Sequence, residues 1–390
     1  MGKHGLAKAV VALSTAWLAL VMAAPTQTVK TLVNFDNTNG GDPYAAALKQ
    51  GFDGNLYGVA AQGGTNTCTL FGGSTSCGVI FKVTTAGKLT VLHSFDGTDG
   101  VSPDGTLVQD ASGNLYGVTQ FGGANTACTA FGADGCGTVF KITPSGDFTS
   151  LYSFCSLANC ADGATPTGGL VLGADGNLYG TTSFSGANYQ DCSGYGCGTI
   201  FKITTTGTLT TLHSFDGTDG QGPGGPLVQL SNGDLYGAAG SGGKKGYGTI
   251  FKITTAGKLT TLHNFTDTDG YGANPLTLGT DGNFYSTTTD GGTTNNSTCG
   301  SYGCGTVFKV TPTGKLTTLY NFCSQPACAD GFGPVWSLMQ ASDGNLYGNT
   351  GDYNGTTFVN DGTIFKVTTG AHLRICTRST AAMANILKAP

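Results

Sequence analysis

Short runs of alternating apolar and polar residues recur along the chain, separated by clusters of Gly, Asp, Asn, Thr and Ser. Runs such as Leu-Thr-Thr-Leu-His-Ser-Phe and Gly-Thr-Ile-Phe-Lys-Ile-Thr are rich in β-branched and aromatic residues, which predicts β-strands of about four to seven residues. The Asp-Gly-Asn and Thr-Ala-Gly separators favour tight hairpin turns. With 66 Gly among 390 residues, the chain is not expected to form long helices, because Gly has a low helix propensity.

Four such phrases recur in a fixed order. Asp-Gly-Asn-Leu-Tyr-Gly, or a close relative, begins at residues 53, 112, 175, 232, 281 and 343. The Phe-Lys phrase centres on Phe81, Phe140, Phe201, Phe251, Phe308 and Phe365, and the Leu-Thr-Thr phrase ends at Phe95, Phe154, Phe215, Phe265 and Phe322. A short Pro-led phrase contains Leu107, Leu170, Leu227 and Leu338. Four strands in about 50 residues, repeated six times, are typical of β-propeller blades.

We therefore expect an all-β fold over residues 24–370, a six-bladed β-propeller of four-stranded antiparallel blades. Residues 29–35 form an extra copy of the Leu-Thr-Thr phrase, and no good copy follows Phe365. The N-terminal strand should then close the ring as the outer strand of the last blade. Residues 371–390 contain both Arg and the unpaired Cys376 and are expected to form an atypical tail. With the four phrases assigned to the strands of a blade in this order, every variable loop lies on one face of the propeller, where function is expected.

The N-terminal region and the cysteines both indicate export. Residues 1–23 have a weakly positive start, an apolar run and small residues before a cleavage point, as in a signal peptide. Twelve of the 13 Cys form close sequence pairs, which favours short-range disulfides over zinc. These pairs are Cys68 and Cys77, Cys128 and Cys136, Cys155 and Cys160, Cys192 and Cys197, Cys299 and Cys304, and Cys323 and Cys328. A secreted or cell-surface protein without a transmembrane helix after signal cleavage is predicted.

These combined phrases resemble the GloVer tandem repeat. That repeat occurs in exported bacterial proteins grouped by their interchangeable surface anchors. The likeness covers about residues 29–369 and implies an extracytoplasmic repeat protein. It assigns no activity and no catalytic residues.

Aromatic residues in the loops between second and third strands are the best candidates for ligand binding, since exposed rings can stack on sugar faces. These are Phe71, Phe121, Phe131, Phe184, Tyr189, Tyr195, Tyr247, Tyr302, Tyr353 and Phe358. The alternative is that they cover the disulfides and the blade ends.

Asp-rich loops between blades are candidates for calcium, which prefers several oxygen ligands on a loop that can bend. They contain Asp96, Asp99, Asp216, Asp219, Asp267 and Asp269. Ordinary turn chemistry also uses Asp and Gly, so calcium is one of two interpretations.

The expected function is a binding module for extracellular polysaccharide or, second, a surface protein, acting as a monomer. A net charge of −5 argues against nucleic acid as a partner. One alternative is a carbohydrate-active enzyme using Asp residues near the propeller axis, and another is a structural surface protein. The sequence shows no catalytic motif, so an enzyme is the less favoured interpretation. Asp residues clustered around the axis would favour the enzyme, whereas a row of exposed aromatic rings would favour glycan binding.

Overall fold

A computed structural model of the chain describes residues 31–43, 47–126, 128, 135–188, 190–293, 297–299, 302–351 and 362–378. The expected signal peptide, residues 1–23, lies outside these ranges. Within them, no helix has the length and apolar character needed to cross a bilayer.

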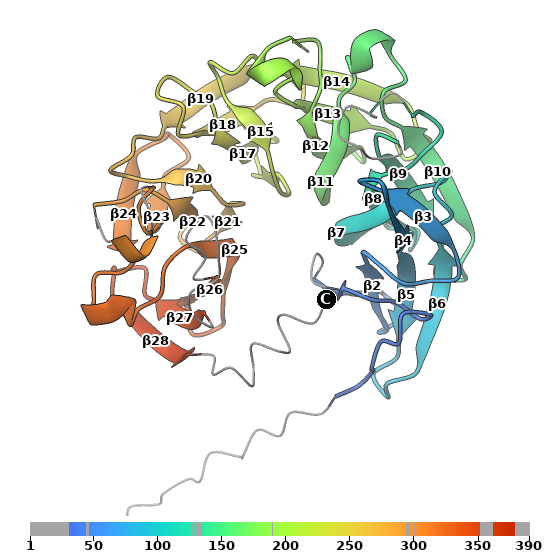
Figure 1. Cartoon of the computed structure of the whole chain (residues 1–390), viewed down its shortest axis with the longest axis horizontal. Coiled ribbons are helices and arrows are strands. Elements are labelled where there is room, and N and C mark those ends of the chain that lie inside the picture. Colours follow the sequence, from blue (N-terminus) through green and yellow to red (C-terminus); the bar gives the residue numbers. More distant parts are fainter. Residues whose placement is uncertain are drawn as a thin grey trace, which may run out of the picture.

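The described strands form six blades arranged around one axis (Figure 1). Blade 1 contains β1 (Lys49–Gln50), β2 (Leu56–Ala60), β5 (Val79–Val83) and β6 (Leu89–Ser94). Blade 2 contains β7 (Val101–Gln109), β8 (Leu115–Phe121), β9 (Thr138–Ile142) and β10 (Phe148–Ser153). Blade 3 contains β11 (Ala164–Leu172), β12 (Leu178–Phe184), β13 (Thr199–Ile203) and β14 (Leu209–Ser214).

The second half repeats this plan. Blade 4 contains β15 (Gln221–Pro223), β16 (Val228–Gln229), β17 (Leu235–Ser241), β18 (Thr249–Ile253) and β19 (Leu259–Asn264). Blade 5 contains β20 (Tyr271–Ala273), β21 (Thr277–Leu278), β22 (Phe284–Asp290), β23 (Thr306–Val310) and β24 (Leu316–Asn321). Blade 6 contains β25 (Pro334–Gln340), β26 (Leu346–Thr350), β27 (Thr363–Val367) and β28 (Leu373–Arg378). The predicted strand order is confirmed: Pro-led phrase, Leu-Tyr-Gly, Phe-Lys, then the outer strand.

The hydrophobic core lies between blades. Alternate residues of a strand point to opposite faces of the sheet, and both faces of blades 2 to 5 are covered by neighbouring blades. Tyr236 and Ile250 of blade 4 pack against Leu276, Phe284 and Phe308 of blade 5. The same arrangement forms a core between each consecutive pair of blades from blade 1 to blade 6. Two buried faces explain why successive residues of a third strand are buried, as are Thr199, Ile200 and Phe201 of β13.

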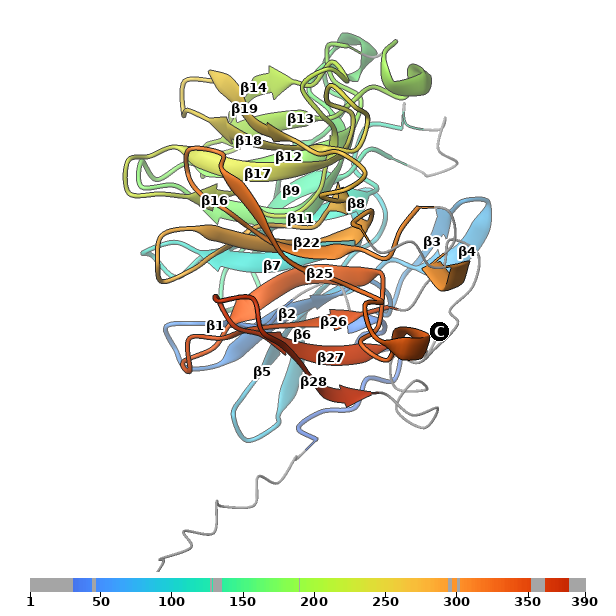
Figure 2. The same ribbon diagram turned by 90° about the vertical axis from the view of Figure 1, so that its left-hand side faces the viewer.

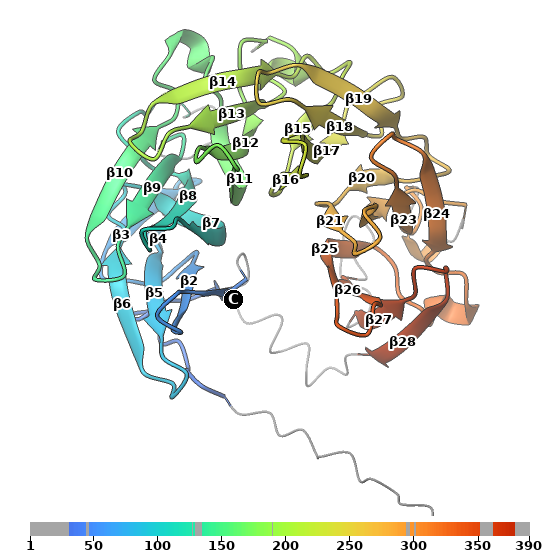
Figure 3. The same cartoon turned by 180° about the vertical axis from the view of Figure 1, so that it is seen from behind.

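One face of the ring carries long loops and the other carries short turns (Figure 2). Figure 1 is seen from the loop-rich side and Figure 3 from the opposite side. The loop-rich face includes the hairpin of β3 (Thr67–Leu70) and β4 (Gly73–Ser76) and the short helices η3 (Ala158–Cys160), η4 (Cys192–Gly194), η5 (Ser297–Cys299) and η6 (Pro326–Cys328).

All six predicted cysteine pairs are confirmed as disulfides. The bonds are Cys68–Cys77, Cys128–Cys136, Cys155–Cys160, Cys192–Cys197, Cys299–Cys304 and Cys323–Cys328. Four of them lie in loops between second and third strands, and their second cysteines are fully buried two residues before the third strand: Cys77, Cys136, Cys197 and Cys304. The other two lie in loops that cross to the next blade. The disulfides therefore anchor the long loops to the ends of the blades.

The expected closure of the ring by residues 29–35 is wrong. The outer strand of blade 6 is β28, which pairs antiparallel with β27 from Val367↔Leu373 to Thr363↔Arg378. Leu373 and Ile375 pack against the core of that blade, so the edge of β27 is already occupied. The propeller therefore extends into the segment that was expected to be a separate tail.

Candidate functional site

The inner strands enclose a hollow of about 610 Å³ around the propeller axis. Gln120, Ser183 and Gly240 line it near the ends of β8, β12 and β17 that meet the loop-rich face. Thr106, Pro226 and Ser337 line it farther along the inner strands. Its size is within the range of small-molecule sites, and most of its lining groups are uncharged.

Glycine brings the inner strands close together beside this hollow. Gly105, Gly168 and Gly225 all have positive φ, and a Cβ on any of them would collide with the next inner strand. The strands β7 and β11 even share a parallel bridge, Gly169↔Thr106. Glycine is required here because it alone allows both the backbone conformation and the close approach.

Asp104 is the acidic residue that lines this hollow among the described residues. It is 8% exposed, and its Oδ2 accepts a hydrogen bond of 2.9 Å from the backbone N–H of Gly168. Asn274, across the hollow, donates to Thr287 Oγ1 and to the Pro334 carbonyl. The hollow thus contains one carboxylate within the described ranges, rather than the Asp cluster that would favour the enzyme alternative.

Three of the predicted aromatic residues are exposed in loops of the loop-rich face, on blades 1, 3 and 5. Phe71 is 66% exposed, Tyr195 45% and Tyr302 59%. Phe71 is at the tip of the β3–β4 hairpin with φ 53°, followed by Gly72 with φ 75°. A left-handed conformation is uncommon for a bulky residue, and the hairpin turn enforces it here.

The other predicted aromatic residues that the structure describes are less exposed to solvent. Phe121 packs edge-on against Phe71 at 5.5 Å between ring centroids, and Tyr247 packs against Tyr271 at 5.7 Å. Phe121, Phe184 and Tyr247 are all half-buried. Phe131, Tyr189, Tyr353 and Phe358 lie outside the described residues. The exposed rings stay candidates for ligand binding, whereas the half-buried rings pack against the loops.

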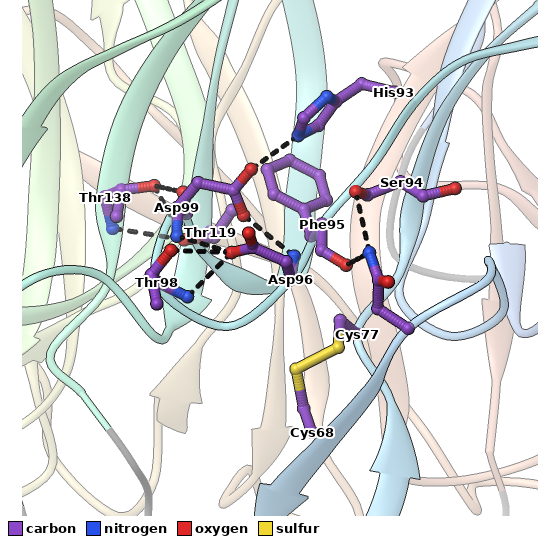
Figure 4. A network of polar contacts seen from close by, with 11 residues as sticks. Cys68, Cys77, His93, Ser94, Phe95, Asp96, Thr98, Asp99, Thr119 and Thr138 are labelled. Atoms are coloured by element: carbon purple, nitrogen blue, oxygen red, sulfur yellow. Dashed lines mark hydrogen bonds and ion pairs between the residues drawn. A yellow bond between two sulfur atoms is a disulfide. The ribbon is translucent and has the colours of Figure 1, made fainter.

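The first Asp-rich loop is held by its own hydrogen bonds (Figure 4). Asp96 Oδ1 accepts from the Thr98 backbone N–H and hydroxyl at 2.9 and 2.8 Å. Asp99 Oδ1 accepts from the Asp96 N–H at 2.9 Å, and Asp99 Oδ2 lies 2.7 Å from His93 Nε2. The bond from Thr98 is the main reason why the pKa of Asp96 is lowered. These hydrogen bonds stabilise the loop and engage Asp96 Oδ1 and both carboxylate oxygens of Asp99.

The other Asp-rich loops vary this arrangement. Asp216 and Asp219 repeat it with Thr218 and His213. In the third loop Thr266 takes the place of Asp96, Asp269 pairs with His263 at 3.0 Å, and Asp267 is exposed. Among the described residues, the side chains of His, Cys and Asp that gather in groups of three or more are disulfide cysteines. Calcium at the Asp-rich loops stays a prediction for experiment.

The loops that cross from blades 2 and 5 to the next blade are held by a different set of hydrogen bonds. The Tyr152 hydroxyl donates to Asp162 Oδ2 at 2.8 Å, and the backbone N–H groups of Ser156 and Leu157 donate to the same carboxylate. Tyr320, Ser324 and Gln325 surround Asp330 in the same way. Asp162 and Asp330 are fully buried. Each of these loops is closed by a disulfide, Cys155–Cys160 or Cys323–Cys328.

Comparison with known sequences identifies the family. The Gloeobacter/Verrucomicrobia repeat matches residues 19–191 and 189–383. The chain belongs to this repeat family. The match confirms the resemblance drawn from the motifs. None of the curated proteins compared with the chain matches it.

One solved structure shares the fold of this Gloeobacter/Verrucomicrobia repeat protein, and two others resemble it more weakly. The extracellular domain of a putative hybrid two-component system from B. thetaiotaomicron is 12% identical with a TM-score of 0.51, over 87% of this chain and 37% of that chain. A putative 6-phosphogluconolactonase from Bacteroides uniformis is 16% identical with a TM-score of 0.49, over 85% and 83%. A gluconolactonase from Xanthomonas campestris is 11% identical with a TM-score of 0.41, over 70% and 76%. At these identities the likeness concerns the fold alone.

Three residues of this repeat protein were missed by the sequence analysis. Asp104 follows the Pro of a Pro-led phrase and gave no distinct signal. Trp336 takes the place of Gly105 in its own Pro-led phrase, with φ 68° and 54% exposure, and that substitution could have been found by aligning the repeats. Burial raises the pKa of Asp290, at the loop-rich end of β22, to about 6. A raised carboxyl pKa depends on burial, which the sequence does not show.

The six disulfides are evidence for an oxidising compartment. Their number and short spans fit an extracytoplasmic protein, in agreement with the expected export.

Proposed function

We propose that this repeat protein is a secreted or cell-surface module that binds extracellular polysaccharide through its loop-rich face. The observation that carries the proposal is the exposure of Phe71, Tyr195 and Tyr302 on blades 1, 3 and 5 of that face. Rings with one open side bind the apolar faces of sugars, while nearby Asn, Thr and Asp side chains can bond to hydroxyl groups. Three separated rings fit a polymer better than a single small molecule.

The strained tip of the β3–β4 hairpin supports this proposal. The turn needs φ above zero at residue 71, where Gly or Asn would be the least strained choice. Phe71 instead places an exposed phenyl ring there. Backbone strain of this kind is found most often at ligand sites.

Retention on insoluble polysaccharides tests the proposal. Purified residues 24–390 should be retained by at least one polymer of a panel. Replacing Phe71, Tyr195 and Tyr302 together by Ala should weaken retention at least about tenfold, since each ring contributes roughly 0.5–1.5 kcal/mol. Phe52→Ala is the matched control, because Phe52 is 74% exposed in a short turn of the opposite face. Loss of retention in the control but not in the triple variant would refute the assignment.

Two further measurements distinguish calcium-dependent binding and the enzyme alternative from the proposed function. Retention that disappears with a chelator would support calcium at the Asp-rich loops, and unchanged retention would argue against it. Release of reducing sugar that is abolished by Asp104→Asn would favour the enzyme alternative. A retaining glycosidase needs two carboxylates about 5 Å apart, and Asp104 supplies one. No retention on any polymer would favour a protein partner or a structural role.

A further inference from the structure

Blade 6 and blade 1 stand apart on the two sides of an opening in the ring (Figures 1 and 3). The described strands of all other consecutive blades pack against one another, whereas no comparable packing joins β25–β28 to β1–β6. Five cores fill the other junctions. At this junction, the core of blade 1 is covered only by Val33 and Phe35 among the described residues.

Both sides of the opening expose side chains that are buried in every other blade. Ile364 of blade 6 is 48% exposed, and its counterparts are fully buried: Ile80, Val139, Ile200, Ile250 and Val307. Leu48 of blade 1 is 52% exposed, and its counterparts are at most 4% exposed: Leu107, Leu170, Leu227, Leu276 and Leu338. Met339 of the inner strand β25 in blade 6 is 61% exposed. An apolar surface of this kind marks an interaction site.

Residues 31–35 already lie where the outer strand of a preceding blade would lie. Phe35 contacts Phe81 edge-on at 5.2 Å, and the outer-strand Phe of other blades contacts the next blade in the same geometry, as in Phe215–Phe251 at 5.3 Å. The Leu32 carbonyl lies over Gly87, as the Leu212 carbonyl lies over Gly257. The turn that follows, in which Asp36 accepts hydrogen bonds from Thr38 and Asn39, repeats the loop of Asp96.

That preceding blade is not blade 6. Blade 6 has its own outer strand, β28, on the only edge of β27 where residues 31–35 could pair. Residues 31–35 thus occupy the outer-strand position of a blade whose three inner strands are not among the described strands of this chain. The opening is bounded by two blade faces and by this segment.

We propose that the opening binds a partner three-stranded β-sheet of the same repeat, from outside residues 31–378, with residues 31–35 as its outer strand. The partner's Leu and Phe would pack on Ile364 and Met339, as Leu227 and Phe251 pack on Ile200. Its Tyr and Ile would pack on Leu48 and Phe81. Strand pairing supplies backbone hydrogen bonds, and the apolar contacts supply specificity. The proposal is independent of polysaccharide binding.

A fragment of the chain itself is a suitable probe. Residues 221–253 comprise β17, β18 and the innermost strand of blade 4, which is divided into β15 and β16, and they contain no cysteine. A labelled peptide of this sequence should bind residues 24–390 saturably, one to one. Ile364→Asp and Leu48→Asp should each weaken binding at least about tenfold. Leu157→Asp should not, because Leu157 is 54% exposed but lies in the loop of η3, away from the opening.

A second measurement keeps the test decisive if the peptide aggregates. An open junction predicts that Ile364→Asp leaves the denaturation midpoint unchanged, whereas Ile250→Asp, at a closed junction, lowers it strongly. Equal losses in the two variants would overturn the proposal.

Two alternative arrangements of the opening are distinguished by further measurements. If residues 31–35 displace β28, Asn34→Cys and Thr363→Cys should cross-link in a Cys376→Ser chain, since these positions would then be paired as Asn264 and Thr249 are. If a second copy fills the opening, the chain should be a dimer that Ile364→Asp dissociates. Either result, with no peptide binding, would refute a three-stranded partner.

Discussion

The loops that cross from one blade to the next come in two versions. In blades 1 and 3, Asp99 and Asp219 follow the last Phe of the outer strand by four residues and pair with His93 and His213. In blade 2, Asp162 follows Phe154 by eight residues and pairs with Tyr152. The first version leaves the Asp side chains about one-fifth exposed, and the second buries Asp162 completely.

The two versions of the crossing loop also differ in their disulfides. In blade 1 the Cys68–Cys77 disulfide lies against Gly97, where a Cβ would come within 3.3 Å of Cys68 Sγ. Blade 3 repeats this, with Cys192–Cys197 against Gly217. In blade 2 the crossing loop carries its own disulfide, Cys155–Cys160, beside Cys128–Cys136. A longer loop costs more entropy to order, and the extra cross-link offsets part of that cost. The longer loop in turn covers the carboxylate.

The largest expected effect is on the buried carboxylate. Asp162→Ala should destabilise the fold by about 3 kcal/mol, because the Tyr152 hydroxyl and two backbone N–H groups would lose an acceptor that is itself fully buried. Asp219→Ala should cost about 1 kcal/mol, since its partners can reach water. Urea denaturation of both variants measures the difference. Equal losses would mean that burial does not separate the two versions.

Removing the cross-link of the longer loop should have the next largest effect. Replacing Cys155 and Cys160 together by Ala should cost about 2 kcal/mol on the loop-entropy estimate. If the disulfide holds the loop over Asp162, Asp162→Ala should cost less in this background than in the parent chain. A double-mutant cycle by urea denaturation gives the coupling. Strict additivity would show that disulfide and carboxylate act independently.

The His–Asp pair should contribute less. His213→Phe removes the hydrogen bond to Asp219 but keeps an aromatic ring against Phe215, 5.1 Å away. We expect a loss of about 1 kcal/mol, measured as a shift of the denaturation midpoint. His372→Phe is the control, because His372 is an exposed residue of a turn. A loss in the control of similar size would contradict a specific role for the pair.

The smallest expected effect is a dependence on acid. Hydrogen bonds from Thr98 and Thr218 lower the pKa of Asp96 and Asp216 below the usual 3.8. A lowered folded-state pKa stabilises the fold above pH 3.8, and that contribution is lost as the pH falls through the folded-state pKa. Because both groups are exposed, each should contribute only a few tenths of a kcal/mol.

Denaturation midpoints measured between pH 5 and pH 2 would show this effect as a steeper decline in the parent chain than in Asp216→Asn. An identical decline in the two proteins would mean that Asp216 does not contribute to the loss of stability in acid.

Much of this comparison could be anticipated from the repeats. The disulfide pairs follow from close sequence spacing, and the strand order follows from the order of the phrases. Asp162 was not singled out, because its burial depends on how η3 folds back over it. The exposed rings of Phe71, Tyr195 and Tyr302 could not be separated from the half-buried rings of Phe121 and Tyr247, since loop residues have no periodicity that reports burial.

The sequence by itself determined the blade: local turn chemistry, strand alternation and short-range cysteine pairs all act within a few residues of one another. Only the tertiary structure decided how the ring ends. Residues 31–35 and 373–378 both have a strand-like sequence that could pair with the edge of β27, and strand pairing is set by contacts between distant parts of the chain. The structure gives that edge to β28 and leaves residues 31–35 against blade 1. The axial hollow with Asp104 likewise exists only when four or more inner strands meet, which no single repeat can specify.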